Sequence, residues 1–220
     1  MEAIVPIALI LIVLILAGGV AAGILLRKRQ FRGYGELLRQ GAGWQRLPAD
    51  PQLWQRVAVL RWFAGRLGLQ DLFHFGGEYR GVRFEAVQYR RPPRVGERVY
   101  VAAIAVYLPR PVPGPSLHLA RQGQWAPLGQ DSVVPTGHPQ FDQSFMVTSS
   151  DPDFARAVLN PGLVDGLLRD QRTDSCVIEF GPEHVVAFAT KVATKNTVLP
   201  MLDLVADVHA GVAWQALDRR

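Results

Sequence analysis

The stretch VRFEAVQYRRPPRVGERVYVAAIAVYL (Val82–Leu108) predicts a β-hairpin, and the other predicted elements are arranged around it. From Val82 to Val87 every second residue is apolar, which is typical of a half-buried strand. Pro92 and Pro93 cannot donate to a sheet ladder, so pairing should end there. Val99–Leu108 is apolar at nearly every position and rich in β-branched and aromatic residues, which predicts a central strand buried on both faces.

The rest of the chain adds helices and further short strands. Asp50, Ser150-Asp151 and Asn160 each precede a proline in the arrangement that begins helices. The predicted helices cover residues 51–66, two short segments after Asp151 and Asn160, and residues 197–216; the predicted strands cover residues 116–121, 141–148, 175–180 and 184–192. The links between neighbouring strands are too short for parallel crossovers. We therefore expect an α+β domain with a mostly antiparallel sheet and packed helices.

An apolar segment, Ile4–Leu26, precedes this domain. It has 23 residues and no charge. A helix of that length is about 34 Å long, enough to cross a hydrocarbon core of about 30 Å. No Lys or Arg precedes it, which argues against a cleaved signal peptide. The predicted fold class is therefore a single N-terminal transmembrane helix followed by one α+β domain.

The flank of this segment predicts its orientation. Arg27, Lys28, Arg29 and Arg32 follow it, whereas no cation precedes it. Cytoplasmic flanks carry the excess of Lys and Arg, so we expect a single-pass protein of the cell membrane with a cytoplasmic C-terminal domain. These four residues would meet membrane lipid. Cys176 is the only cysteine, so an internal disulfide is excluded, in agreement with a reducing compartment.

Gly19 and Gly23 lie four residues apart within the apolar segment. This small-xxx-small spacing lets two transmembrane helices approach closely, so it predicts helix–helix contact and self-association through the span. The alternative is that glycine is simply common in such helices.

The charge of the chain is divided unevenly along its length. The net charge is +5, but residues 33–110 carry +6 and residues 111–220 carry −4. A basic half would face an anionic leaflet. Nucleic-acid binding is not expected, because no stretch combines basic residues with base-stacking aromatics. The predicted parts are a short extracytoplasmic end (1–3), the transmembrane helix (4–26), a basic juxtamembrane linker (27–48), a soluble α+β domain (49–216) and a tail (217–220).

The segments GEYRGVRFEAVQYRR, VYLPRPVPGPSLHLAR, FDQSFMVTSSDPDFARAVLNPGLVDGLL, CVIEFGPEHVVAF and LDLVADV carry a family resemblance. Together they span roughly Gly76–Val208, and the pattern F-D-x-x-F-x-V-x-x-x-D-x-x-x-A is the most specific part. The chain resembles a family of uncharacterised bacterial membrane-anchored proteins with a soluble domain of unknown function. The resemblance implies a membrane location and a single domain, and it assigns no activity, cofactor or functional residue.

Motifs for catalysis, metals and cofactors are not found in the sequence. The five histidines are far apart, and one cysteine cannot build a thiolate site. Gly76, Gly77 and Gly81 do not form a phosphate-binding motif. Ser132 and Ser144 do not lie in a nucleophile elbow. We therefore predict no catalytic residue, no cofactor and no metal.

Three local groupings allow a chemical interpretation beside a structural one. His138 and Asp142 could orient each other, although Asp142 is better explained as a local cap. Asp203 and Asp207 share one helix face, with His209 beyond them, and would either hold a cation or be solvated. Cys176 opens an apolar strand, where a buried small hydrophobe is its ordinary role.

The sequence thus favours a membrane-tethered, non-enzymatic cytoplasmic interaction or scaffold domain with an unidentified protein partner. Two alternatives stay open. The first is a hydrolase or transferase whose acids come from Asp142, Asp151 or Glu179. The second is an anionic-lipid surface module that uses Arg56, Arg61 and Arg66 from an amphipathic helix.

Overall fold

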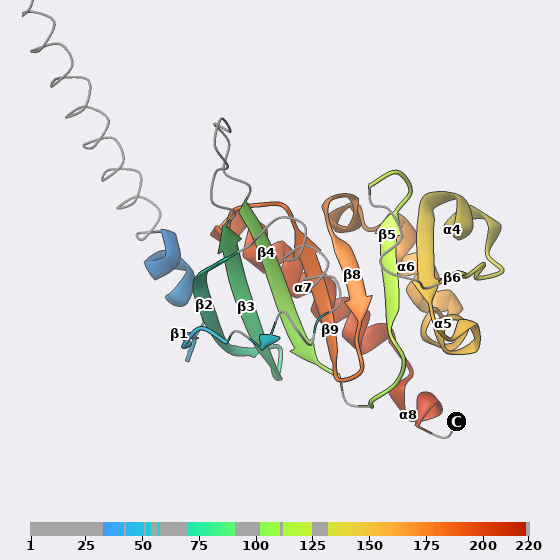
Figure 1. The fold of residues 1–220 in the computed structure, drawn as a ribbon, viewed down its shortest axis with the longest axis horizontal. Helices are drawn as coiled ribbons and strands as arrows, with labels where there is room; N and C mark the ends of the chain where they lie inside the picture. The colour runs from blue at the N-terminus through green and yellow to red at the C-terminus, as the bar shows by residue number, and fades with distance from the viewer. Residues whose placement is uncertain are drawn as a thin grey trace, which may run out of the picture.

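The computed structural model describes residues 33–41, 43–50, 52–53, 57, 70–90, 102–110, 112–124 and 132–218. In this part of the chain, one antiparallel sheet forms the centre and the helices pack against it (Figure 1). The strands are β1 (Gln45–Arg46), β2 (Gln70–Tyr79), β3 (Val82–Arg90), β4 (Ala102–Pro109), β5 (Leu117–Arg121), β6 (Ser132–Val133), β7 (Phe145–Ser149), β8 (Val177–Phe180) and β9 (His184–Ala189). The helices are α4 (Pro139–Ser144), α5 (Pro152–Val158), α6 (Pro161–Arg169), the 3₁₀ helix η1 (Gln171–Ser175), α7 (Lys195–Gly211) and α8 (Trp214–Leu217).

The strand order brings distant parts of the chain together. It runs β1-β2-β3-β4-β9-β8-β5-β7-β6, and every neighbouring pair is antiparallel. The predicted hairpin is confirmed, because β3 pairs with β4 and Ala86 lies opposite Val106. The second predicted hairpin, β8–β9, is also confirmed. It inserts between β4 and β5, so the C-terminal third of the chain joins the two halves of the sheet.

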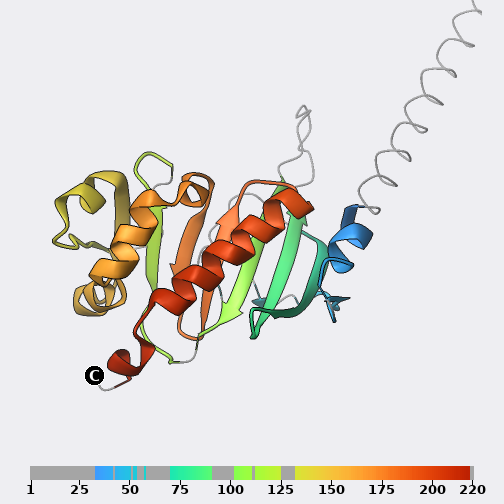
Figure 2. The same ribbon diagram turned by 180° about the vertical axis from the view of Figure 1, so that it is seen from behind.

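One face of the sheet carries most of the hydrophobic core. Helix α7 crosses this face diagonally over β4 and β9, and α6 lies beside it toward β5 (Figure 2). Alternate residues of each strand point toward these helices, as the pleat requires. Fully buried side chains on this face include Phe84, Leu108 and Phe180. Burying one such side chain contributes about 1.5–3 kcal/mol, so this layer supplies much of the stability.

Strand β2 contains two adjacent glycines, and Trp44 packs against one of them, Gly77. A Cβ atom on Gly77 would lie 2.7 Å from Cδ1 of Trp44. The indole Nε1 donates to the carbonyl of Glu78 at 3.0 Å, and its ring meets Phe84 edge-on at 4.8 Å. Glycine is therefore needed at this position so that the indole can approach the strand.

The hydrophobic core includes residues N-terminal to the predicted domain boundary. Residues 33–38 are helical, and Tyr34, Leu37 and Trp44 are buried in the core. Tyr34 stacks on Phe73 of β2 at 4.2 Å. The segment predicted as a linker thus contributes three core side chains at the β2 end of the sheet.

The predicted fold class needs correction at its first element. No helix within the described ranges is long and apolar enough to cross a membrane. The longest, α7, has 17 residues and carries Asp203, Asp207 and Pro200. Its length is about 26 Å, below the roughly 30 Å of a hydrocarbon core. The fold is therefore a nine-stranded antiparallel sheet with packed helices, and the structure does not support the single-pass membrane description.

Several predicted residues fall on parts of the chain that are not described. They are the predicted span 4–26, the predicted contact residues Gly19 and Gly23, and the predicted membrane flank Arg27, Lys28, Arg29 and Arg32. Most of the predicted helix 51–66, including Arg56, Arg61 and Arg66, also lies outside the described residues. The cytoplasmic orientation depended on the span and the flank, and the structure does not test it.

Two predicted elements differ locally from the structure. The strand expected over residues 141–148 begins only at Phe145, because Pro139 starts the helix α4 before it. The helix expected over residues 197–216 ends at Gly211, and the short helix α8 follows. Neither helix propensity nor the spacing of apolar residues predicts where this strand begins or where this helix ends.

The predicted cap of α5 is confirmed and can be tested. The Asp151 carboxylate accepts the backbone N–H groups of Asp153 at 3.0 Å and Phe154 at 2.9 Å. We expect Asp151→Ala to lower the free energy of unfolding by about 1 kcal/mol, because two N–H groups lose their acceptor. Urea unfolding measures this loss. Asp153→Ala, in the same exposed turn, is the control and should cost less; equal losses would contradict the cap.

Candidate functional site

A groove lies between α6 and α7. Both helices cover the same face of the sheet (Figure 2). Its volume is about 380 Å³, within the range of ligand pockets. Leu163 and Leu167 of α6 form one wall, and Leu204 and Val208 of α7 form the other. The remaining lining residues are glycines and polar residues: Asn160, Gly162, Gly166, Asp170, Arg172, Asp207 and Gly211.

The sequence around α6 explains why the two helices leave this space. The Asn160 side chain caps α6 by accepting from the N–H of Leu163 at 3.1 Å, and it donates to the carbonyl of Gly211 at 2.9 Å. This ties the start of α6 to the end of α7. Gly162 and Gly166 are exposed one turn apart, and a Cβ on Gly166 would meet no atom within 4 Å. The missing side chains leave the backbone of α6 bare along the groove.

Ion pairs close the other end of the groove. Arg172 binds Asp170, with Nη2 to Oδ2 at 2.6 Å, and its Nη2 also reaches Asp207 at 2.7 Å. Arg80 comes from the β2–β3 turn and binds both Asp207 at 2.7 Å and Asp203 at 2.5 Å. Asp203 and Asp207, predicted either to hold a cation or to be solvated, instead pair with two arginines. The network fixes α7 to the β2–β3 turn and to η1.

The pKa values of these groups follow from their partners. The hydrogen bond that Arg172 donates to Asp170 raises the pKa of Arg172, and burial only partly opposes it. Burial tends to raise the pKa of Asp170, but hydrogen bonds from Arg172 outweigh it and the pKa is lowered. Burial and the hydrogen bond to Asp203 raise the pKa of Tyr79. These shifts favour a charged Arg172, an ionised Asp170 and a neutral Tyr79. The three groups therefore keep these charge states near neutral pH.

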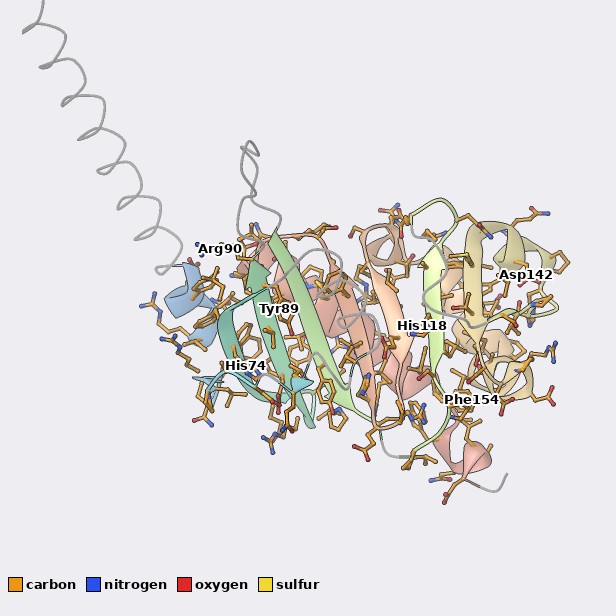
Figure 3. All side chains as sticks on the ribbon, in the orientation of Figure 1. His74, Tyr89, Arg90, His118, Asp142 and Phe154 are labelled. Atoms are coloured by element: carbon orange, nitrogen blue, oxygen red, sulfur yellow. The ribbon has the colours of Figure 1, made fainter. Side chains whose placement is uncertain are left out.

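A separate polar cluster is buried within the sheet. Glu179 on β8 is fully buried, and its two oxygens face two histidines: Nε2 of His184 at 3.3 Å and Nε2 of His118 at 3.7 Å. Leu117 and Leu119 belong to the core below α7, so His118 between them points to the opposite face of the sheet. Figure 3 shows His118 on β5, beside β8. The Tyr107 ring packs against His184 at 5.1 Å.

The hairpin turn is shaped to hold one of these histidines. A Cβ atom on Gly181 would lie 2.0 Å from Cε1 of His184. The N–H of Gly181 donates to the carbonyl of His184 at 2.9 Å, which closes the turn. Glycine at this position therefore lets the imidazole fold over the turn toward Glu179.

The other residues singled out from the sequence have local roles. The Asp142 carboxylate accepts from the N–H and the hydroxyl of Thr136 at 3.0 and 2.7 Å (Figure 3 labels Asp142). Its described contact with His138 is a backbone hydrogen bond. Asp151 caps α5, and Glu179 lies in the buried cluster. The three acids of the enzyme hypothesis are thus in three separate places. Within the described ranges, no group of three or more His, Cys, Asp or Glu could hold a metal ion.

Sequence reasoning missed the groove. Its strongest signal was Asn160-Pro161 followed by Gly162 and Gly166, which places two glycines on one face of a short helix. The ion pairs had no sequence signal, since Arg80 and Asp207 are 127 residues apart. Only the strand order brings the β2–β3 turn to α7.

Comparison with known proteins shows the fold alone. No family model and no curated protein sequence matches the chain. Among solved structures, it is similar to the crystal structure of the mycobacterial trehalose monomycolate transport factor A, TtfA, with a TM-score of 0.57 and 15% sequence identity. The similarity covers 86% of this chain and 93% of that chain. The sheet and its helices are therefore an arrangement that a known transport factor also has.

Proposed function

We propose that this chain is a non-enzymatic interaction domain and that the groove between α6 and α7 receives an aliphatic segment of a partner protein. The observation that carries the proposal is the chemistry of the groove. Its walls are aliphatic side chains that are already buried in the core, its polar end is paired internally, and Gly162 and Gly166 expose helix backbone between them. Such a surface binds by shape and apolar contact.

A helix or extended segment of a partner fits this surface best. Glycines one turn apart allow a close approach of another backbone, which a larger side chain would prevent. The Arg172–Asp207 pair at one end offers little to a charged ligand, because each group already has a partner of opposite sign. The similar structure is that of a protein named as a transport factor, and a transport role in this chain would equally require a binding groove.

Photo-cross-linking tests the proposal. In the full chain, Gly166→Cys would place an exposed thiol in the groove, and a benzophenone maleimide attached to it should cross-link the partner in extracts of the producing cells. Adding Gly162→Leu should reduce the cross-linked yield at least about tenfold, because the leucine fills the groove. The exposed position of Gly162 and the higher helix propensity of leucine should keep α6 folded.

The matched control is Asp165→Cys, which is exposed on the same helix and does not line the groove. It should not yield the same product. Equal products from both cysteines, or a yield that Gly162→Leu leaves unchanged, would contradict the proposal.

A further inference from the structure

Arg110 lies at the start of the proline-rich connector between β4 and β5, and this connector turns its side chain inward. The N–H of Arg110 donates to the carbonyl of Glu183 at 2.8 Å, and the N–H of Gly114 donates to that of Pro182 at 3.2 Å. These bonds fasten the connector to the β8–β9 turn. As a result only 6% of Arg110 is exposed, which is unusual for a residue that is always charged.

Two aromatic rings hold the guanidinium group of Arg110. Its Cζ lies 5.3 Å from the ring of Phe154 and 5.7 Å from the ring of Trp214. Phe154 is on α5 where this helix meets α8 (Figure 3), and Trp214 is the first residue of α8. The rings attract the cation through their faces. They leave the N–H groups along the edge of the guanidinium without an acceptor.

The unused N–H groups of Arg110 form one side of its guanidinium. Nη1 makes a long contact of 3.5 Å with the carbonyl of Pro115. Nε and Nη2 are buried and have no hydrogen-bond partner in the described structure. These two atoms carry parallel N–H groups, the pair that binds two oxygens of one carboxylate or phosphate. Within the same part of the chain, Arg110 makes no ion pair with a carboxylate, and burial lowers its pKa to about 10.

His209 brings a second unused nitrogen to the same aromatic ring. Its imidazole packs against Trp214 at 5.5 Å, and its backbone carbonyl accepts from Trp214 Nε1 at 2.8 Å. Nε2 of His209 is buried without a partner among the residues described, so the hydrogen bond to Pro109 uses Nδ1. Burial lowers the pKa of His209, so the neutral ring presents Nε2 as an acceptor.

We propose that Arg110 binds an oxyanion, a phosphate or carboxylate group, through Nε and Nη2 where the connector, α5 and α8 meet. Trp214 covers the bound group, and His209 packs against the same indole ring. Trp214 and Leu217 of α8 pack against the core but are only partly buried, so a ligand would enter by a shift of this four-residue helix. The site is separate from the groove between α6 and α7, because Arg110 and Trp214 do not line that groove.

Isothermal titration of the full chain tests this site with three probes: inorganic phosphate, acetate, and vesicles of phosphatidylcholine with or without phosphatidic acid. We expect saturable binding of at least one anionic probe with a Kd of about 1 mM or tighter. Binding of free phosphate or acetate would assign a small anion. Binding only to vesicles with phosphatidic acid would assign a lipid headgroup. Saturable binding of none of these probes would overturn the proposal.

The variant Arg110→Lys keeps the charge and loses the paired N–H groups, so it should weaken binding at least about tenfold. Arg169→Lys, on an exposed arginine of α6, is the matched control and should leave binding unchanged. If Arg110→Lys fails to fold, Trp214→Leu removes one side of the cage and should weaken binding in the same direction. Unchanged affinity in the folded variants would overturn the proposal, whatever the outcome of the cross-linking at the groove.

Discussion

Replacing Glu179 by alanine is expected to lower the free energy of unfolding by about 3–5 kcal/mol, because a buried polar cluster loses one partner. Glu179 is fully buried between His118 and His184. A buried carboxylate is tolerated only when it is paired and hydrogen-bonded, and a buried histidine has the same requirement. Alanine would leave two imidazoles beside a cavity and would remove the acceptor that both face.

Urea unfolding followed by circular dichroism measures this loss. Glu183→Ala is the matched control, because Glu183 is exposed in the same hairpin turn and should change stability by less than about 0.5 kcal/mol. Glu179→Gln keeps the size and one acceptor, so it should lie between the two. A loss in Glu179→Ala no larger than in the control would show that the cluster does not stabilise the sheet. That result would favour the enzyme alternative, in which Glu179 serves chemistry.

Cys176 is expected to react with a disulfide reagent at pH 8 about 10³-fold more slowly in the folded chain than in the unfolded chain, because few molecules carry the thiolate. Burial raises the pKa of the Cys176 thiol from its usual 9.0 to about 12. The side chain is 2% exposed, and its Sγ donates to the carbonyl of Arg172 at 3.4 Å. Both the low thiolate fraction and the poor access slow the reaction.

The measurement compares absorbance traces in buffer and in guanidinium chloride. The double variant Cys176→Ala with Gly166→Cys provides an exposed thiol on the same protein, which should react at nearly the unfolded rate. A native Cys176 rate within about tenfold of the unfolded rate would mean that β8 opens readily. The prediction also matters for the cross-linking experiment, because labelling must be confined to the introduced cysteine.

The sequence predicted those elements whose signal is local. Val82–Leu108 showed both strands of the first hairpin, and the proline after Asp151 or Asn160 marked two helix starts. Strand β2 was missed because Gly76 and Gly77 interrupt its apolar pattern; Gly77 accommodates Trp44, and Gly76 accommodates the Phe84 carbonyl and Leu47. The insertion of β8–β9 between β4 and β5 has no local signal, since it depends on which apolar faces meet.

The two sites proposed here were harder to predict than the fold. The groove depends on the spacing of α6 and α7, and the Arg110 site depends on rings that are 44 and 104 residues further along the chain. Composition and motif searches examine neighbours in sequence, so they cannot find groups that only the sheet order brings together. The enzyme hypothesis named Glu179, and it is the one of the three acids that the structure places beside titratable partners.

The two outermost strands, β1 and β6, have two residues each, and all four residues are exposed. A sheet grows when another chain pairs with the backbone of its edge strand. An edge strand of two residues presents few unpaired N–H and C=O groups to a neighbouring copy. Within the described part of the chain, each outermost strand therefore offers a second copy only a two-residue row for pairing, which disfavours end-to-end growth of the sheet.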